Sequence, residues 1–165
     1  ILWLENGGDG AVWTRRVVSN VVANALDVGV ADVDGDSDVD VVSADFGSGV
    51  IYFHSNTGGG ATFDTSTIST LVVGAYSVDF ADINKDGMLD VFSCGWNGGG
   101  VYVHTQAKDN AGNVAWITTE VAEEAADGAN SVWADDINND GAVDVVIALS
   151  PGTVEWFESP NPAAY

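Results

Sequence analysis

The sequence predicts an all-β fold, and three observations lead to that prediction. A pattern recurs about every 50 residues: Ile1, Ile51, Val101 and Val154 stand at matching places, separated by 50, 50 and 53 residues. Short apolar stretches that alternate with period two flank an acidic loop in each repeat, and such alternation is typical of strands. Glycine-rich clusters separate the later strands of the repeats, as hairpin turns require.

The second repeat shows its predicted strands most plainly. Alternating apolar residues before its acidic loop predict a first strand at about residues 77–83. The apolar runs after the loop predict a second strand at about 89–94 and a third at about 101–106. A fourth, at about 114–121, follows a turn rich in Asp, Asn and Gly. Four antiparallel strands in about 50 residues predict the blade of a β-propeller.

The chain is predicted to hold about three such blades, in one propeller segment over residues 1–159. Residues 1–26 end one blade, 27–76 and 77–130 are complete blades, 131–159 form a blade lacking its last strand, and 160–165 are a tail. Propellers close with about four to eight blades, so this count leaves two open edges. Because open edges invite further strand pairing, we expect other chains, or further blades of a longer propeller, to complete the ring.

Each acidic loop carries oxygen-bearing side chains at its first, third, fifth and ninth positions. They are Asp32, Asp34, Asp36 and Asp40 in loop 1; Asp82, Asn84, Asp86 and Asp90 in loop 2; and Asp136, Asn138, Asp140 and Asp144 in loop 3. Alternate residues of a tight turn converge on one point, and Ca²⁺ takes about six to eight such oxygens. The seventh positions, Asp38, Met88 and Ala142, share no side-chain type, which suits a backbone carbonyl ligand. The sequence therefore predicts about three Ca²⁺ ions, one per loop.

An alternative interpretation is that Asp, Asn and Gly are simply turn formers. It accounts for the glycines but not for four spaced oxygens in three loops, because uncompensated carboxylates repel each other. Loop 1 departs from the pattern: Ser37 stands where the other loops have Gly87 and Gly141, and Gly35 lies two residues earlier. This leaves its metal geometry open between the pattern of the other loops and an altered one. An EF-hand is excluded because no helical periodicity follows the loops.

The motif V-x-x-A-D-I-N-x-D-G-x-x-D-V, followed by a strand such as GVIYFHSN or ILWLEN, resembles the FG-GAP/VCBS repeats of integrin-α-like and lectin-like β-propellers. The resemblance covers residues 1 to about 159. It implies a calcium ion at the turn between the first two strands of each blade. It also implies an extracellular role in adhesion, in carbohydrate binding or as an accessory domain. Some relatives are attached to enzymes, so the resemblance alone gives no activity.

Acidic residues dominate the charge: 25 Asp and Glu against 4 Lys and Arg give a net charge of −21. Such a surface disfavours nucleic acid and anionic membranes, because phosphate binding requires Lys and Arg. No apolar stretch is long enough for a membrane span, and the single Cys94 cannot form an internal disulfide. An extracellular or secreted location is instead expected from calcium, because extracellular modules bind it with a Kd of about 10⁻⁴ to 10⁻³ M.

The sequence predicts that the chain is not an enzyme. Its only histidines, His54 and His104, stand at the same place in successive repeats, which indicates a structural site rather than a unique catalytic base. No nucleophile motif accompanies them, and the carboxylates that could serve as an acid–base pair are mostly committed to the loops, which hold 11 of the 25 acidic residues.

A ligand-binding face is predicted at the end of the blades opposite the metal loops. It would carry Asp45, Phe46, Tyr76, Trp96 and Asn97, because aromatic faces beside polar groups suit a small specific site. The alternative interpretation is that these aromatics fill space between blades. Four further tryptophans are expected to be packing residues because they recur at repeat positions: Trp3, Trp13, Trp116 and Trp156.

Three functions follow from these observations. The first is a calcium-binding extracellular propeller module for adhesion or for recognition of a carbohydrate or protein ligand. The second is an assembly module whose open blade edges pair with other chains. The third is an accessory segment of a larger secreted enzyme.

Overall fold

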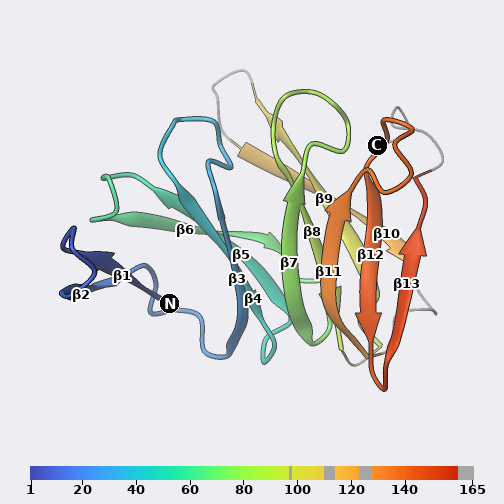
Figure 1. Ribbon diagram of the computed structural model, residues 1–165, viewed down its shortest axis with the longest axis horizontal. Helices are drawn as coiled ribbons and strands as arrows, with labels where there is room; N and C mark the ends of the chain where they lie inside the picture. The colour runs from blue at the N-terminus through green and yellow to red at the C-terminus, as the bar shows by residue number, and fades with distance from the viewer. Residues whose placement is uncertain (97, 110–113, 123–127, 160–165) are drawn as a thin grey trace.

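The computed structural model describes residues 1–96, 98–109, 114–122 and 128–159. These residues form thirteen β-strands in four antiparallel sheets, which stand side by side (Figure 1). The described residues contain no helix that could cross a membrane. The predicted all-β fold of propeller blades is therefore confirmed. Asn97 and the predicted tail, 160–165, lie outside the described residues.

The four sheets follow one another along the chain. The first is a hairpin of β1 (Leu2–Asn6) and β2 (Trp13–Val17). Blade 1 contains β3 (Ala25–Ala31), β4 (Asp40–Asp45), β5 (Val50–Asn56) and β6 (Phe63–Ser69). Blade 2 contains β7 (Ala75–Ala81), β8 (Asp90–Gly95), β9 (Val101–Lys108) and β10 (Val114–Ala122). Blade 3 contains β11 (Ala129–Asp135), β12 (Asp144–Leu149) and β13 (Thr153–Phe157). The four predicted strands of the second repeat correspond to β7 to β10.

The first strand of blade 2 begins at Ala75, earlier than its alternation predicts, because a β-bulge interrupts the pattern. In blade 2 the pairing of β7 with β8 shifts between Ala75 and Ser77, so that Tyr76 is the extra residue. Blades 1 and 3 have the same shift, at Leu26 and at Asn130. A bulge re-aims the side chain that it carries.

Blade 2 is covered on both faces, which explains why its sequence is apolar at consecutive positions. Successive residues of a strand point to opposite faces. Val91 of β8 belongs to the cluster shared with blade 1, which includes Ile51. Phe92, the following residue, belongs to the cluster shared with blade 3, which includes Ile147. All four side chains are fully buried.

The first strands of the three blades, β3, β7 and β11, lie next to one another. The ring of Phe80 fills the space beside Gly29, where an added Cβ would lie 2.4 Å from the ring, so this close approach requires glycine. The carboxylate of Asp79 accepts the N–H of Ala134 across the next junction, at 2.8 Å. Packing and polar contacts together hold the blades in register.

The outer faces of the two end blades remain uncovered. Val28 of blade 1 is 49% exposed, whereas its counterparts Val78 and Val132 are 7% and 2% exposed. On blade 3, Val154 is 71% exposed and its counterpart Val101 is fully buried.

Two of the four tryptophans expected to pack lie elsewhere than in a covered blade, Trp13 on the hairpin and Trp156 on blade 3. Trp13 is 55% and Trp156 is 48% exposed, so the expectation is wrong for both. The physical reason is that, among the described residues, no neighbouring blade covers either side chain.

Candidate metal loops and aromatic cleft

The three acidic loops join β3 to β4, β7 to β8 and β11 to β12, and they gather at one end of the blades (Figure 1, top). Each loop follows the first strand of its blade, and these strands are neighbours. The repeat therefore places the three loops in a row.

All three loops share one backbone conformation, with a positive φ at the fourth and sixth positions. The φ angles are 74° and 79° at Gly35 and Ser37, 60° and 86° at Lys85 and Gly87, and 60° and 88° at Asn139 and Gly141. Loop 1 has its glycine at the fourth position, and Ser37 takes the positive φ at the sixth. The departure in the sequence of loop 1 thus leaves its backbone conformation unchanged.

Side chains of the loops accept backbone N–H groups of the same loop. In loop 2 the N–H of Asp86 donates to Asp82 and Asn84, at 3.1 and 3.0 Å, and the N–H of Met88 donates to Asp86, at 2.8 Å. Loop 3 repeats these bonds with Asp136, Asn138, Asp140 and Ala142. In loop 1 the N–H of Asp38 donates to Asp36, at 2.9 Å. A carboxylate oxygen that accepts one N–H keeps a further lone pair, so these bonds leave room for a cation.

The ninth residue of each loop is a fully buried carboxylate that ties the loop to its blade. In loop 2 one oxygen of Asp90 accepts the N–H of Ile83, at 3.1 Å, and the other accepts the N–H of Gln106, at 2.9 Å. The corresponding bonds of Asp40 go to Val33 and Asn56, and those of Asp144 go to Ile137 and Ser159. The ninth residue therefore joins the second residue of the loop to the end of the third strand.

Burial makes two of these carboxylates costly to ionise. It raises the pKa of Asp90 to about 6 and also raises the pKa of Asp40, although backbone N–H groups oppose the shift in both. At the exposed fifth position of loop 3, the N–H of Ala142 and the side chain of Asn138 lower the pKa of Asp140. A cation next to the ninth residue would offset the cost of ionising it.

The donor set fits calcium. Carboxylate oxygens of Asp32, Asp34 and Asp40 lie within 4.8 Å of one another. At their first, third, fifth and ninth positions the loops offer carboxylate and amide oxygens and no sulfur or imidazole, which favours calcium or magnesium over softer metals. The flexible coordination of calcium suits a loop more than the strict octahedron of magnesium does.

The two histidines occupy equivalent buried places, as their spacing predicts. His54 bridges Ser43 and Thr65, with distances of 3.0 Å to Nε2 and 2.9 Å to Nδ1. His104 bridges Ser93 and Thr118 in the same way, at 2.8 and 2.9 Å. Burial lowers the pKa of His54 to about 4 and that of His104 to about 3. Each imidazole is thus a neutral link between three strands.

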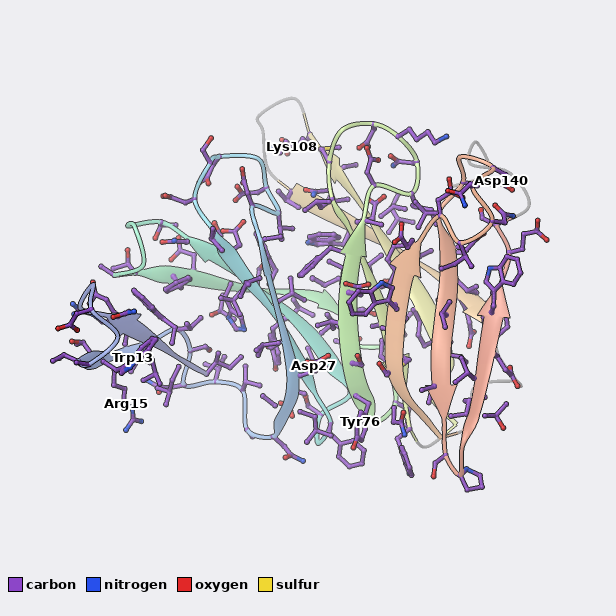
Figure 2. The ribbon with its side chains drawn as sticks, viewed as in Figure 1. Trp13, Arg15, Asp27, Tyr76, Lys108 and Asp140 are labelled. Atoms are coloured by element: carbon purple, nitrogen blue, oxygen red, sulfur yellow. The ribbon has the colours of Figure 1, made fainter. Side chains whose placement is uncertain are left out.

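Three of the predicted ligand-binding residues meet at the opposite end of the blades. Figure 2 shows Tyr76 at the end away from Lys108 and Asp140. The ring centroid of Tyr76 lies 6.2 Å from that of Phe46 and 5.6 Å from that of Trp96. With Asn24 and Leu26 these rings line a cleft of about 310 Å³.

Asp45 lies behind this cleft rather than in its lining. Its side chain is 2% exposed, and its carboxylate accepts the N–H groups of Ala23, Asn24 and Gly47. It therefore fixes the loops around the cleft. Asn97 lies outside the described residues. Sequence reasoning missed Leu26, although its place 50 residues before Tyr76 was a usable signal, and it missed Asn24.

The sequence model of one protein family, the FG-GAP-like repeat, matches residues 32–93 and again residues 83–147. Together the two matches span more than half of the chain, and each runs from one acidic loop into the blade that carries the next. No curated protein matches the chain.

Proposed function

This chain belongs to the FG-GAP-like repeat family, and from that premise we propose that it is a calcium-binding, extracellular β-propeller module for adhesion or for recognition of a carbohydrate or protein. The observation that carries the proposal is the shared conformation of the three loops, with a positive φ at the same two positions in each. A metal site that recurs in each blade requires the same turn geometry around the spaced oxygens each time.

Calcium would stabilise the folded blades. Each loop holds its ninth carboxylate buried among other acidic groups, so the metal-free fold bears a cost of desolvation and repulsion that a divalent cation reduces. Sites of this kind in extracellular modules have a Kd of about 10⁻⁴ to 10⁻³ M, too weak to fill in resting cytosol. This supports an extracellular or secreted location.

Thermal unfolding tests the calcium role. A ligand that binds only the folded state at ten to a hundred times its Kd stabilises that state by about 1.4 to 2.7 kcal/mol per site. At 10 mM CaCl₂ we therefore expect a melting temperature several degrees above that in EDTA. Asp86→Ala should remove about a third of the shift, whereas the exposed Asp64→Ala should leave it intact. Identical melting curves in CaCl₂ and EDTA would contradict the proposal.

The cleft of Phe46, Tyr76 and Trp96 is the proposed recognition site. Aromatic faces stack on apolar faces of a ligand, and the neighbouring Asn24 offers a polar group that could fix its orientation. The cleft lies away from the metal loops (Figure 2), which supports a structural rather than a ligand-bridging role for calcium.

A glycan array, run with calcium and with chelator, tests recognition. Tyr76→Leu is a matched variant, because leucine stands at the same bulge in blade 1 as Leu26. It should abolish any signal, and Trp133→Leu, on the exposed face of blade 3, should not. If no glycan binds in calcium, the proposal of a carbohydrate ligand is excluded and that of a protein ligand remains.

A second candidate function is assembly, and the exposed apolar end faces favour it. A cavity of about 450 Å³ lies between the hairpin and blade 1, lined by Trp3, Val30, Val41 and Phe63 among others. Val30, at its rim, is 62% exposed. Other chains or further blades would cover these faces. A folded, stable monomer in calcium, measured by native mass, would argue against closure by other chains.

We further propose that the chain has no catalytic activity of its own. The two histidines, the groups best suited to act as a general base at neutral pH, are fully buried and neutral. The net charge of −21 also supports the absence of nucleic acid and anionic lipid among its partners. Turnover by the purified chain of any substrate, lost in His54→Gln or His104→Gln, would overturn this.

A further inference from the structure

Loops 1 and 2 are joined through one buried side chain, Gln106 at the end of β9. Its Nε2 donates to the carbonyl of Val33, in loop 1, and to the carbonyl of Leu89, in loop 2, both at 2.6 Å. Gln106 is 2% exposed. Both acceptors are carbonyl oxygens, so the carboxamide must present its NH₂ to them, and its orientation is fixed by that requirement.

These two bonds complete a chain of hydrogen bonds between the ninth residues of the two loops. The N–H of Val33 donates to Asp40, at 2.9 Å, and the N–H of Gln106 donates to Asp90, also at 2.9 Å. A shift of the peptide at Val33 therefore reaches Asp90 through a single side chain. The two loops lie in adjacent blades, and they face a shared cleft of about 340 Å³.

The same position in the other blades lacks this bridge. Asn56, its counterpart in blade 1, is one methylene shorter, and its Nδ2 donates only to Val39 of its own loop, at 3.1 Å. Ser159, the counterpart in blade 3, has no amide, and its hydroxyl has no hydrogen-bond partner among the described residues. Of the three loops, the first two alone are joined in this way within the described part of the chain.

We propose that Gln106 couples calcium binding at loops 1 and 2, so that these two sites fill cooperatively. The inference rests on the proposed function, in which each loop binds calcium. Binding at one loop fixes its backbone and its ninth carboxylate, and the hydrogen-bonded chain then holds the other loop in the conformation that binds. The second ion meets a smaller ordering cost, and this gives positive coupling.

Lys108, two residues farther along β9, makes a separate contact between these blades. Its Nζ donates to the carbonyl of Asp34 in loop 1. The ammonium group lowers the local negative charge of loop 1, and among the described residues it donates no hydrogen bond to loop 2. Lys108→Gln is therefore a control in which the calcium affinity of loop 1 changes and its coupling to loop 2 persists.

A calcium titration followed by NMR can read each loop separately, because the amides of Gly35, Gly87 and Gly141 each lie in a different loop. Asp86→Ala removes the fifth ligand position of loop 2. It should raise the calcium midpoint at Gly35 about five-fold or more and change the midpoint at Gly141 by a smaller factor, because no side chain bridges loops 2 and 3 as Gln106 bridges loops 1 and 2 within the described residues. Coupling is reciprocal, so Asp36→Ala in loop 1 should raise the midpoint at Gly87 by the same factor.

Gln106→Asn is the matched variant, because Asn56 shows that asparagine here can keep the bond within its own loop. In that background, Asp86→Ala should no longer change the midpoint at Gly35. An unchanged Gly35 midpoint in the Asp86→Ala protein with Gln106 intact would overturn the coupling, and so would coupling that survives Gln106→Asn. If calcium shifts none of the three glycines, the proposed function fails as well. The Asp86→Ala and Asp36→Ala proteins test the coupling between loops 1 and 2 even if the Gln106→Asn protein does not fold.

Discussion

The buried histidines predict that part of the stability of the chain is lost on mild acidification. Burial lowers the pKa of His104 from 6.5 to about 3. Between these two pH values the imidazole is protonated in the unfolded chain and neutral in the folded chain. A lowered folded-state pKa gives stability that is full above pH 6.5 and falls as the pH falls toward the folded value. Each pKa unit corresponds to about 1.4 kcal/mol.

The magnitude follows from the window between pH 7 and pH 4.5. Over that window His104 contributes a loss of about 2.5 kcal/mol in the free energy of unfolding. His54, whose folded pKa is about 4, contributes a similar loss. The calcium loops and the raised pKa of Asp90 also make stability depend on pH, so a scan of the wild-type protein alone would mix several effects.

A comparison with His104→Gln isolates the histidine. Glutamine does not titrate, and every other group is present in both proteins. Chemical denaturation at fixed calcium should show the gap between wild type and variant shrink by about 2.5 kcal/mol from pH 7 to pH 4.5. His54→Gln, the repeat counterpart, should do the same. A gap that stays constant across this range, or an NMR titration of His104 near pH 6.5, would refute the reasoning.

Three substitutions test the packing and loop geometry. Ser37→Gly should raise the free energy of unfolding by about 1 kcal/mol, because it relieves a non-glycine residue at a φ of 79°. Gly29→Ala should lower it by about 1 to 3 kcal/mol, because the new Cβ would lie 2.4 Å from the ring of Phe80. Asp79→Ala should lower it by about 1 to 3 kcal/mol, because the N–H of Ala134 loses its acceptor at a blade junction. Urea denaturation in calcium measures all three.

Each of these substitutions has a control within the repeat. Gly87→Ser should destabilise loop 2 about as much as Ser37→Gly stabilises loop 1, since both change the sixth position. Gly7→Ala, in the exposed turn of the hairpin, and Asp64→Ala, on the exposed face of β6, should each change stability by less than about 0.5 kcal/mol. Stability changes of the same sign for Ser37→Gly and Gly87→Ser would contradict the loop argument. Equal losses for Gly29→Ala and Gly7→Ala, or for Asp79→Ala and Asp64→Ala, would contradict the two packing arguments.

The repeat made most of the fold predictable. Local alternation identifies the strands on either side of each loop, and the spacing of the repeats orders them into blades. The bulge at Tyr76 was not predictable from alternation, because it inserts a residue into the pattern. The sequence placed Tyr76 on the ligand-binding face, but its position at a bulge and its neighbour Leu26 in the cleft emerged only from the structure.

Contacts between blades were hidden from the sequence for a different reason. The bridge from Gln106 to Val33 joins residues 73 apart, and no local pattern marks either partner. The exposure of Trp156 likewise depends on which neighbour covers its sheet, which its repeat position does not specify. At Ser37 the residue type itself was misleading, because the surrounding loop imposes a positive φ that serine does not favour.

The most direct test of the account is a count of calcium ions by equilibrium dialysis at millimolar calcium. We predict three saturable sites per chain, and one fewer in each of Asp36→Ala, Asp86→Ala and Asp140→Ala. Magnesium at the same concentration should compete weakly, since it requires a stricter octahedral shell. No saturable calcium binding, or a count unchanged by these three substitutions, would contradict it.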